Sequence, residues 1–135
     1  MKTMTNLYLP ATADTPEINF DCSANTLSLF GESYPENGNA FFSPIFHQLQ
    51  NHLQTLNGEA FLVNFRLIYF NSMSAKMLYV LFQLLDVYAR AHPNAVVVNW
   101  HYDEDDDMAA DFCQDLREEF SHIVVNMHAE TTPAS

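Results

Sequence analysis

One stretch of the 135-residue chain, Phe61–Phe70, is apolar at nearly every position. Its aromatic and branched side chains favour a strand over a helix, and the shortage of polar residues is typical of a strand covered on both faces. A chain of this length holds one core more comfortably than two. We therefore expect Phe61–Phe70 to be the central strand of a single domain that spans residues 1–135.

Hydrophobic periodicity predicts the other strands. Apolar and polar residues alternate in Ile18–Phe20 and in Thr26–Phe30, which predicts a β-hairpin at the start of the fold. Two further runs, Ala95–Tyr102 and His122–Met127, have the composition of buried strands. The predicted sheet therefore has about five strands.

Apolar residues three and four positions apart predict about three helices, which begin at Ser43, after Asn71 and near Met108. Strands and helices alternate along the chain, which indicates an α/β fold with a mixed sheet and right-handed crossovers. The two ends of the chain, residues 1–10 and 130–135, are expected to be frayed.

Charge and cysteine content narrow the range of partners and compartments. The net charge of −12 would repel nucleic-acid phosphates and anionic lipid heads, so neither nucleic acid nor membrane is expected as a partner. The most apolar stretch, Met77–Val87, is interrupted by polar residues, so no membrane insertion is predicted. Cys22 and Cys113 lie far apart, as in proteins of a reducing compartment. We expect a cytoplasmic protein.

The segment that follows Phe70 places hydroxyl groups between a strand and a long helix. A helix N-terminus leaves backbone N–H groups unpaired, so a phosphate on Ser72 would be stabilised there, with Lys76 close by. The alternative is that Ser72 or Ser74 is only an N-cap, a role that contributes about 1 kcal/mol. From position alone, the cap is the simpler interpretation.

A second candidate site is an acidic run at the start of the third predicted helix. It consists of Asp103, Glu104, Asp105, Asp106 and Asp107. A calcium loop is disfavoured because it needs a glycine at its sixth position, where Met108 stands. The run is interpreted as a solvated helix start, or alternatively as a docking surface for a basic partner.

The chain lacks the motifs of common enzyme classes. It has no glycine-rich phosphate loop and no nucleophile elbow, and its six histidines do not show the spacing of metal enzymes. His47 and His52, for example, are five residues apart on a predicted helix. We expect no catalytic site, no metal and no cofactor, and a metal-dependent enzyme built on the acidic run is the least favoured hypothesis.

Four segments in order resemble the SiaC family of bacterial regulatory phosphoproteins, which is similar to anti-sigma-factor antagonists with a STAS-like fold. They are Thr15–Ile18, Gly31–Asn37, Tyr69–Ser72 with Ser74 and Lys76, and Val98–Asp106. The resemblance implies a partner switch. A cognate protein kinase phosphorylates such a protein, a PP2C-type phosphatase reverses this, and the unphosphorylated form binds and stimulates a diguanylate cyclase, which controls cyclic-di-GMP signalling and biofilm formation.

The phosphoacceptor of the family, a threonine directly after a Phe-Asn pair, corresponds to Ser72. Ser74 is the second choice, and Asn71 and Lys76 are the expected neighbours of the phosphate. Met73 stands where relatives often have serine. The alternative function is an unmodified interaction module that docks a basic partner through the acidic run.

Overall fold

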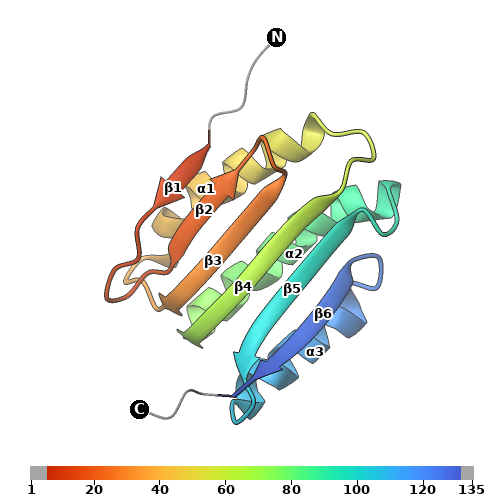
Figure 1. Ribbon diagram of the computed structural model, residues 1–135. Coiled ribbons are helices and arrows are strands. Elements are labelled where there is room, and N and C mark those ends of the chain that lie inside the picture. The colour runs from red at the N-terminus through yellow and green to blue at the C-terminus, as the bar shows by residue number, and fades with distance from the viewer. Residues whose placement is uncertain (1–5, 132–135) are drawn as a thin grey trace.

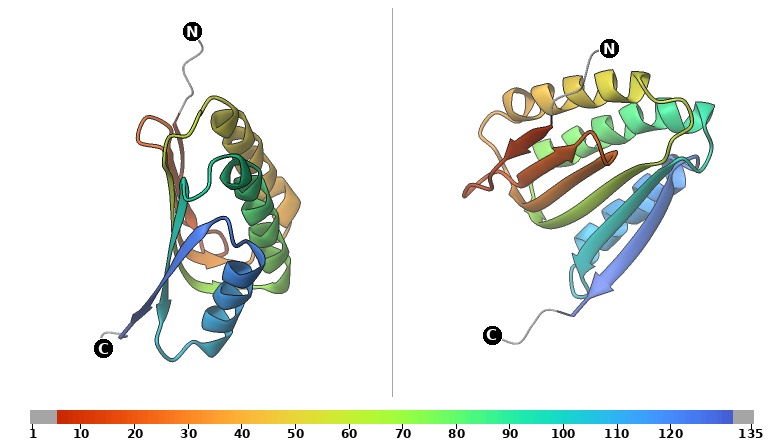
Figure 2. Two further views of the ribbon diagram at one scale, coloured as in Figure 1. Left: turned by 90° about the vertical axis from the view of Figure 1, so that its right-hand side faces the viewer. Right: turned by 45° about the horizontal axis from the view of Figure 1, so that its top comes forward.

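A six-stranded mixed sheet forms one layer of the computed structural model, and three helices form the other (Figures 1 and 2). The structure describes residues 6–131. The strands are β1 (Leu7–Leu9), β2 (Glu17–Asp21), β3 (Thr26–Ser33), β4 (Phe61–Phe70), β5 (Val96–Asp103) and β6 (Val124–Glu130). The helices are α1 (Gly38–Gln54), α2 (Ser72–Ala91) and α3 (Asp107–Glu119). The predicted α/β class and the three helices are confirmed.

The strands lie in the sheet in the order in which they follow along the chain. β1, β2 and β3 pair antiparallel, so the predicted hairpin is present, whereas β3, β4, β5 and β6 pair parallel. Each parallel connection contains one helix, and all three helices cover the same face of the sheet (Figure 2). The carboxyl ends of the parallel strands therefore meet the N-termini of α1, α2 and α3 at one edge.

The core lies between the helices and the covered face of the sheet. Phe65 at the centre of β4 packs on Trp100, with ring centroids 4.7 Å apart, and on Phe82 of α2. The other face of β4 is open, and it carries the exposed Arg66. The expectation that Phe61–Phe70 is covered on both faces is therefore wrong. Leu62 is half-buried because it lies between the neighbouring strands β3 and β5.

Three boundaries differ from the predictions. A short strand, Leu7–Leu9, pairs with β2, so the sheet has one strand more than predicted and the fraying expected of residues 1–10 is wrong for this part. Glu130 ends β6, so its predicted fraying is also wrong. The rest of the expected frayed ends, residues 1–5 and 132–135, lies outside the described residues. None of the helices within residues 6–131 combines the length and apolarity needed to cross a membrane.

The first helix begins five residues before the predicted start at Ser43. Asn37 is its N-cap and accepts a hydrogen bond from the backbone N–H of Ala40. Pro44 therefore lies inside the helix and not at its start. The cap and the burial of Phe42, on the turn before Pro44, outweigh the hydrogen bond that the proline removes.

Candidate functional site

The strand-to-helix junction after β4 is capped by Asn71 and not by a serine. The Oδ1 atom of Asn71 accepts a hydrogen bond of 2.8 Å from the backbone N–H of Ser74. Ser72 is thus the first residue of α2, and its side chain is exposed. The interpretation of Ser72 or Ser74 as the N-cap is wrong, because the asparagine one position earlier fills that role. The Ser72 hydroxyl remains accessible.

Ser74, by contrast, is fully buried. Its hydroxyl donates to the carbonyl oxygen of Ser33 at the end of β3, at 2.8 Å, and lies 2.8 Å from the Ser33 hydroxyl. The same carbonyl accepts from the backbone N–H of Asn71. These bonds tie the start of α2 to β3. A modifying enzyme needs access to its hydroxyl, so the geometry favours Ser72 over Ser74.

A β-bulge interrupts the pairing of β3 and β4 near the end of both strands. Gly31 pairs with Leu67, but the next residue of β3 pairs with Tyr69, so Ile68 is an additional residue in the strand. Gly31 has φ +125°, a conformation that favours glycine. Because of the additional residue, Ile68 and Tyr69 are both exposed, by 72% and 51%. An exposed apolar surface therefore lies directly before Ser72.

The N-termini of α1 and α2 meet beside this surface. The side chain of Met73 lies over Gly38, so closely that a Cβ atom on Gly38 would be 2.7 Å from Met73 Cγ. Neither helix has an acidic residue in its first turn, although the chain has 17 acidic residues. Lys76 is exposed one turn into α2. The partial positive charge of two helix N-termini therefore remains without a neighbouring carboxylate from either first turn.

The structure divides the acidic run into two groups. Asp103 ends β5 and accepts a hydrogen bond from the N–H of Asp105, and Asp106 is the N-cap of α3. Both are half-buried, whereas Glu104, Asp105 and Asp107 are exposed. No three metal-ligating side chains come together anywhere in residues 6–131. The interpretation of the run as a helix start is confirmed for Asp106 and Asp107, whereas Asp103 belongs to β5.

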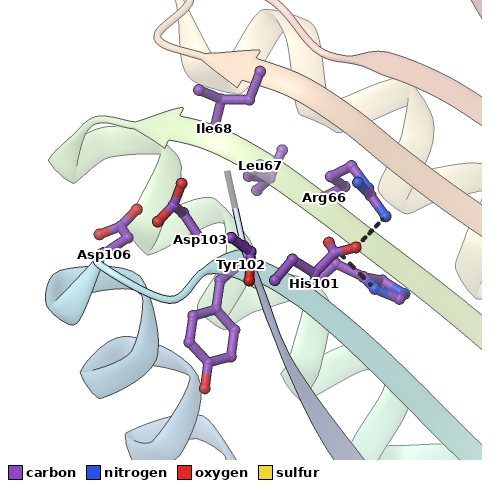
Figure 3. Close-up of a pocket in the computed structure, with 9 residues that line it drawn as sticks. Arg66, Leu67, Ile68, His101, Tyr102, Asp103 and Asp106 are labelled. Atoms are coloured by element: carbon purple, nitrogen blue, oxygen red, sulfur yellow. Dashed lines mark hydrogen bonds and ion pairs between the residues drawn. The ribbon is translucent and has the colours of Figure 1, made fainter. Parts of the chain in front are cut away.

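Asp103 and Asp106 line a pocket of about 450 Å³ at the carboxyl ends of β4 and β5 (Figure 3). At the far end of the pocket, Glu130 bridges Arg66, at 2.9 Å, and His101, at 3.6 Å. Burial lowers the pKa of His101, against the opposing effect of Glu130.

Sequence reasoning did not identify the residues at the far end of this pocket. Arg66 and Glu130 are 64 positions apart, and no local pattern joins them. One signal was present: a charged residue in the middle of an otherwise apolar strand indicates that one face of that strand meets water.

Comparison with known proteins identifies relatives over nearly the whole chain. The family described as SiaC family regulatory phosphoprotein matches residues 9–130. An uncharacterized protein of Pseudomonas aeruginosa strain UCBPP-PA14 is 33% identical over 131 residues, which is 94% of this chain and 100% of that protein.

Solved structures of this group share the fold. The crystal structure of apo-SiaC from Pseudomonas aeruginosa has a TM-score of 0.83 and 29% identity, and the match covers 93% of this chain and 100% of that one. A second crystal structure shows the diguanylate cyclase SiaD of Pseudomonas aeruginosa in complex with its activator SiaC. That match has a TM-score of 0.83 and 29% identity, and it covers 92% of this chain and 99% of that one.

Proposed function

This chain belongs to the SiaC family of regulatory phosphoproteins, and from that premise we propose that it is a phosphorylation-controlled partner switch. The family is one of regulators, so the chain is not an enzyme. In its unphosphorylated form it binds and stimulates a diguanylate cyclase in the cytoplasm. It thereby raises cyclic-di-GMP output and promotes biofilm formation. The related SiaC of Pseudomonas aeruginosa, an activator seen in complex with the cyclase SiaD, supports this proposal.

Ser72 is the proposed phosphoacceptor, and its exposure at the first position of α2 is the observation that carries the proposal. A cognate kinase transfers the γ-phosphoryl group of ATP to Ser72 Oγ. The hydroxyl proton leaves, a P–O ester bond forms and ADP departs. A PP2C-type phosphatase hydrolyses the ester with water, which restores the hydroxyl and releases inorganic phosphate.

The local electrostatics support a phosphate at this position. A phosphoserine carries about −1.5 to −2 charges at neutral pH. The N-termini of α1 and α2 offer partial positive charge without acidic residues in their first turns. The exposed Lys76 adds a cation one turn along α2, while Asn71 holds the helix start in place.

The effect on the partner follows from the surroundings of Ser72. Tyr69 and Met73 flank it and are exposed. A hydrated phosphate between apolar contact residues disfavours a protein interface, because the partner would have to remove its water. Phosphorylation is therefore expected to release the cyclase.

Phosphopeptide mapping across residues 67–76, after incubation with the cognate kinase and ATP, tests the proposal. We expect modification of Ser72 and none of the buried Ser74. Ser72→Ala is expected to keep cyclase binding and Ser72→Asp to weaken it. An unmodified peptide after treatment with a kinase of demonstrated activity, or equal binding by the two variants, would contradict the switch.

The alternative function, an unmodified module that docks a basic partner through the acidic run, makes a different prediction. Reversing the charges of Asp105 and Asp107 would then remove binding in a strongly salt-dependent way. In the switch, the phosphorylation state of Ser72 decides binding.

A further inference from the structure

We propose that the pocket at the carboxyl ends of β4 and β5 accepts an arginine or lysine side chain of the protein that binds the unphosphorylated chain. This inference rests on the proposed function, because it assigns part of the partner's docking surface. The phosphorylation of Ser72 does not depend on the pocket. The pocket and the phosphoacceptor lie at the same edge of the sheet but on different helix junctions.

The walls of the pocket suit the aliphatic part of a long cationic side chain. Leu67 and the exposed Ile68 of β4 line one side of the pocket, and Tyr102 of β5 lines it with its ring directed toward α3 (Figure 3). Arginine and lysine bury their methylene groups against such apolar surfaces while the charged end reaches polar groups. The volume of about 450 Å³ leaves room for one such side chain together with water.

The charges of the pocket are unequally placed. Asp103 and Asp106 lie together at one end, as Figure 3 shows. Asp103 accepts a hydrogen bond of 2.8 Å from the backbone N–H of Asp105. Asp106 accepts one of 3.1 Å from the backbone N–H of Ala109. The second oxygen of each has no hydrogen-bond partner among residues 6–131. Two half-buried carboxylates with free oxygens match the donors of a guanidinium or an ammonium group.

The other end of the pocket does not compete for a cation. Arg66 there is paired with Glu130, which also faces His101. His128 stacks on His101, with ring centroids 4.7 Å apart. The positive charge of Arg66 is thus paired with a carboxylate, whereas no ion pair within residues 6–131 involves Asp103 or Asp106.

A protein partner is favoured over a free cationic metabolite by the surface around the pocket. Eight large hydrophobic side chains are exposed in the described part of the chain, and five of them gather at the ends of β3 and β4 and the start of α2. These five are Phe30, Tyr34, Ile68, Tyr69 and Met73. Ile68 belongs both to this apolar surface and to the pocket wall. A partner that covers the surface therefore reaches the pocket as well.

The two parts of this surface have different roles in the switch. A phosphate on Ser72 would lie among the apolar residues, where it opposes contact, whereas the pocket supplies charge complementarity that is independent of phosphorylation. The pocket therefore selects a partner with a basic residue beside its apolar anchors. Ser72 decides when that partner binds.

A pair of double variants tests the pocket. Asp103→Asn with Asp106→Asn removes two charges from the pocket but keeps both hydrogen-bond acceptors, and asparagine caps a helix as well as aspartate does. Asp105→Asn with Asp107→Asn removes the same charge from the exposed part of the run and is the matched control. Affinity for the purified diguanylate cyclase of the same bacterium is measured by calorimetry at several salt concentrations, with Ser72→Asp in parallel.

We expect the pocket variant to bind at least about tenfold more weakly and with a smaller salt dependence, and the control to change by less than about twofold. Equal affinities of the pocket variant and its control would overturn the pocket assignment, even where Ser72→Asp still weakens binding. Binding that is insensitive to Ser72→Asp but lost in the pocket variant would instead contradict the switch and keep the pocket.

A second measurement does not depend on the cyclase. N-acetyl-arginine amide is titrated into the labelled protein and followed by NMR, with the uncharged N-acetyl-citrulline amide as the matched probe. We expect shifts of the amide signals of Ile68, Tyr102 and Asp103 with the arginine probe only. Identical responses to both probes, or none at these residues, would overturn the assignment.

Discussion

The junctions that begin α2 and α3 share the same capping hydrogen bond and have opposite chemistry. Both follow the carboxyl end of a parallel strand, and in both a side-chain oxygen of the N-cap, Asn71 or Asp106, accepts from the N–H three residues later. The first turn of α2 has no acidic residue, whereas α3 begins with Asp107. One junction is left open to an added anion, and the other already holds carboxylates.

This difference shows that cap geometry does not decide what a helix N-terminus binds. The partial positive charge is common to both helices. At α3 it is balanced by the carboxylates of Asp106 and Asp107, and Asp106 also lines the pocket. At α2 the exposed hydroxyl of Ser72 lies where the proposed phosphate would be added. The charge of the nearby side chains separates the two roles.

The largest expected effect on the free energy of unfolding comes from a substitution that disrupts the start of α2. Ser74→Ala removes a hydroxyl from a fully buried pair and leaves the Ser33 hydroxyl without its partner, at a cost of about 1–3 kcal/mol in the free energy of unfolding. Ser33→Ala with Ser74→Ala removes both groups and should cost less than the sum of the single changes. Urea denaturation measures these values, with the exposed Ser72→Ala as the control. Equal losses at Ser72 and Ser74 would contradict the burial argument.

A smaller effect tests whether the two caps are equivalent. Asn71→Ala and Asp106→Ala each remove one side-chain acceptor from a backbone N–H, so each should lower the free energy of unfolding by about 1 kcal/mol. Denaturation curves under identical conditions give the comparison. A loss at Asp106 alone would show that α2 does not depend on its cap.

Most of the fold follows from sequence patterns, because periodicity reports which residues face a core. The helix after Asn71 was predicted from its period, and the strands in Phe61–Phe70 and Ala95–Tyr102 from their continuous apolar composition. The three-residue strand β1 was missed, since Leu7–Leu9 is too short to show a period. The open face of β4 was missed as well. An apolar sequence does not show whether helices or the side chains of neighbouring strands cover a face of the strand.

The site was predictable only in part. The position of Ser72 at a helix start followed from the change of period, but only the geometry shows which of the nearby residues Asn71, Ser72 and Ser74 is the N-cap. The bulge at Ile68 arises from pairing with β3, and the Arg66–Glu130 bridge joins residues far apart in the chain. Such long-range contacts leave no local pattern.

A charge exchange between the two caps sharpens the comparison further. Asn71→Asp adds a carboxylate to the start of α2 and should stabilise the fold by about 0.3–1 kcal/mol, while Asp106→Asn should cost a similar amount at α3. Both changes keep a good cap, so only charge differs. Thermal or urea unfolding at low and high salt measures the effect, which should shrink as salt rises. Stabilisation that is unaffected by salt would contradict the electrostatic explanation.

The smallest effect concerns acid, which should act on the pocket beside α3 and not on the α2 junction. Burial lowers the pKa of His101, so the unfolded chain binds a proton more readily than the folded protein does. The free energy of unfolding should therefore fall as the pH drops below about 6.5, the ordinary value for histidine. His52, whose pKa is also lowered by burial, contributes in the same direction from the core. His101→Gln should flatten this pH dependence and leave the part due to His52, as measured by urea unfolding between about pH 5 and 8. An unchanged slope in His101→Gln would show that the pocket histidine does not couple protonation to folding.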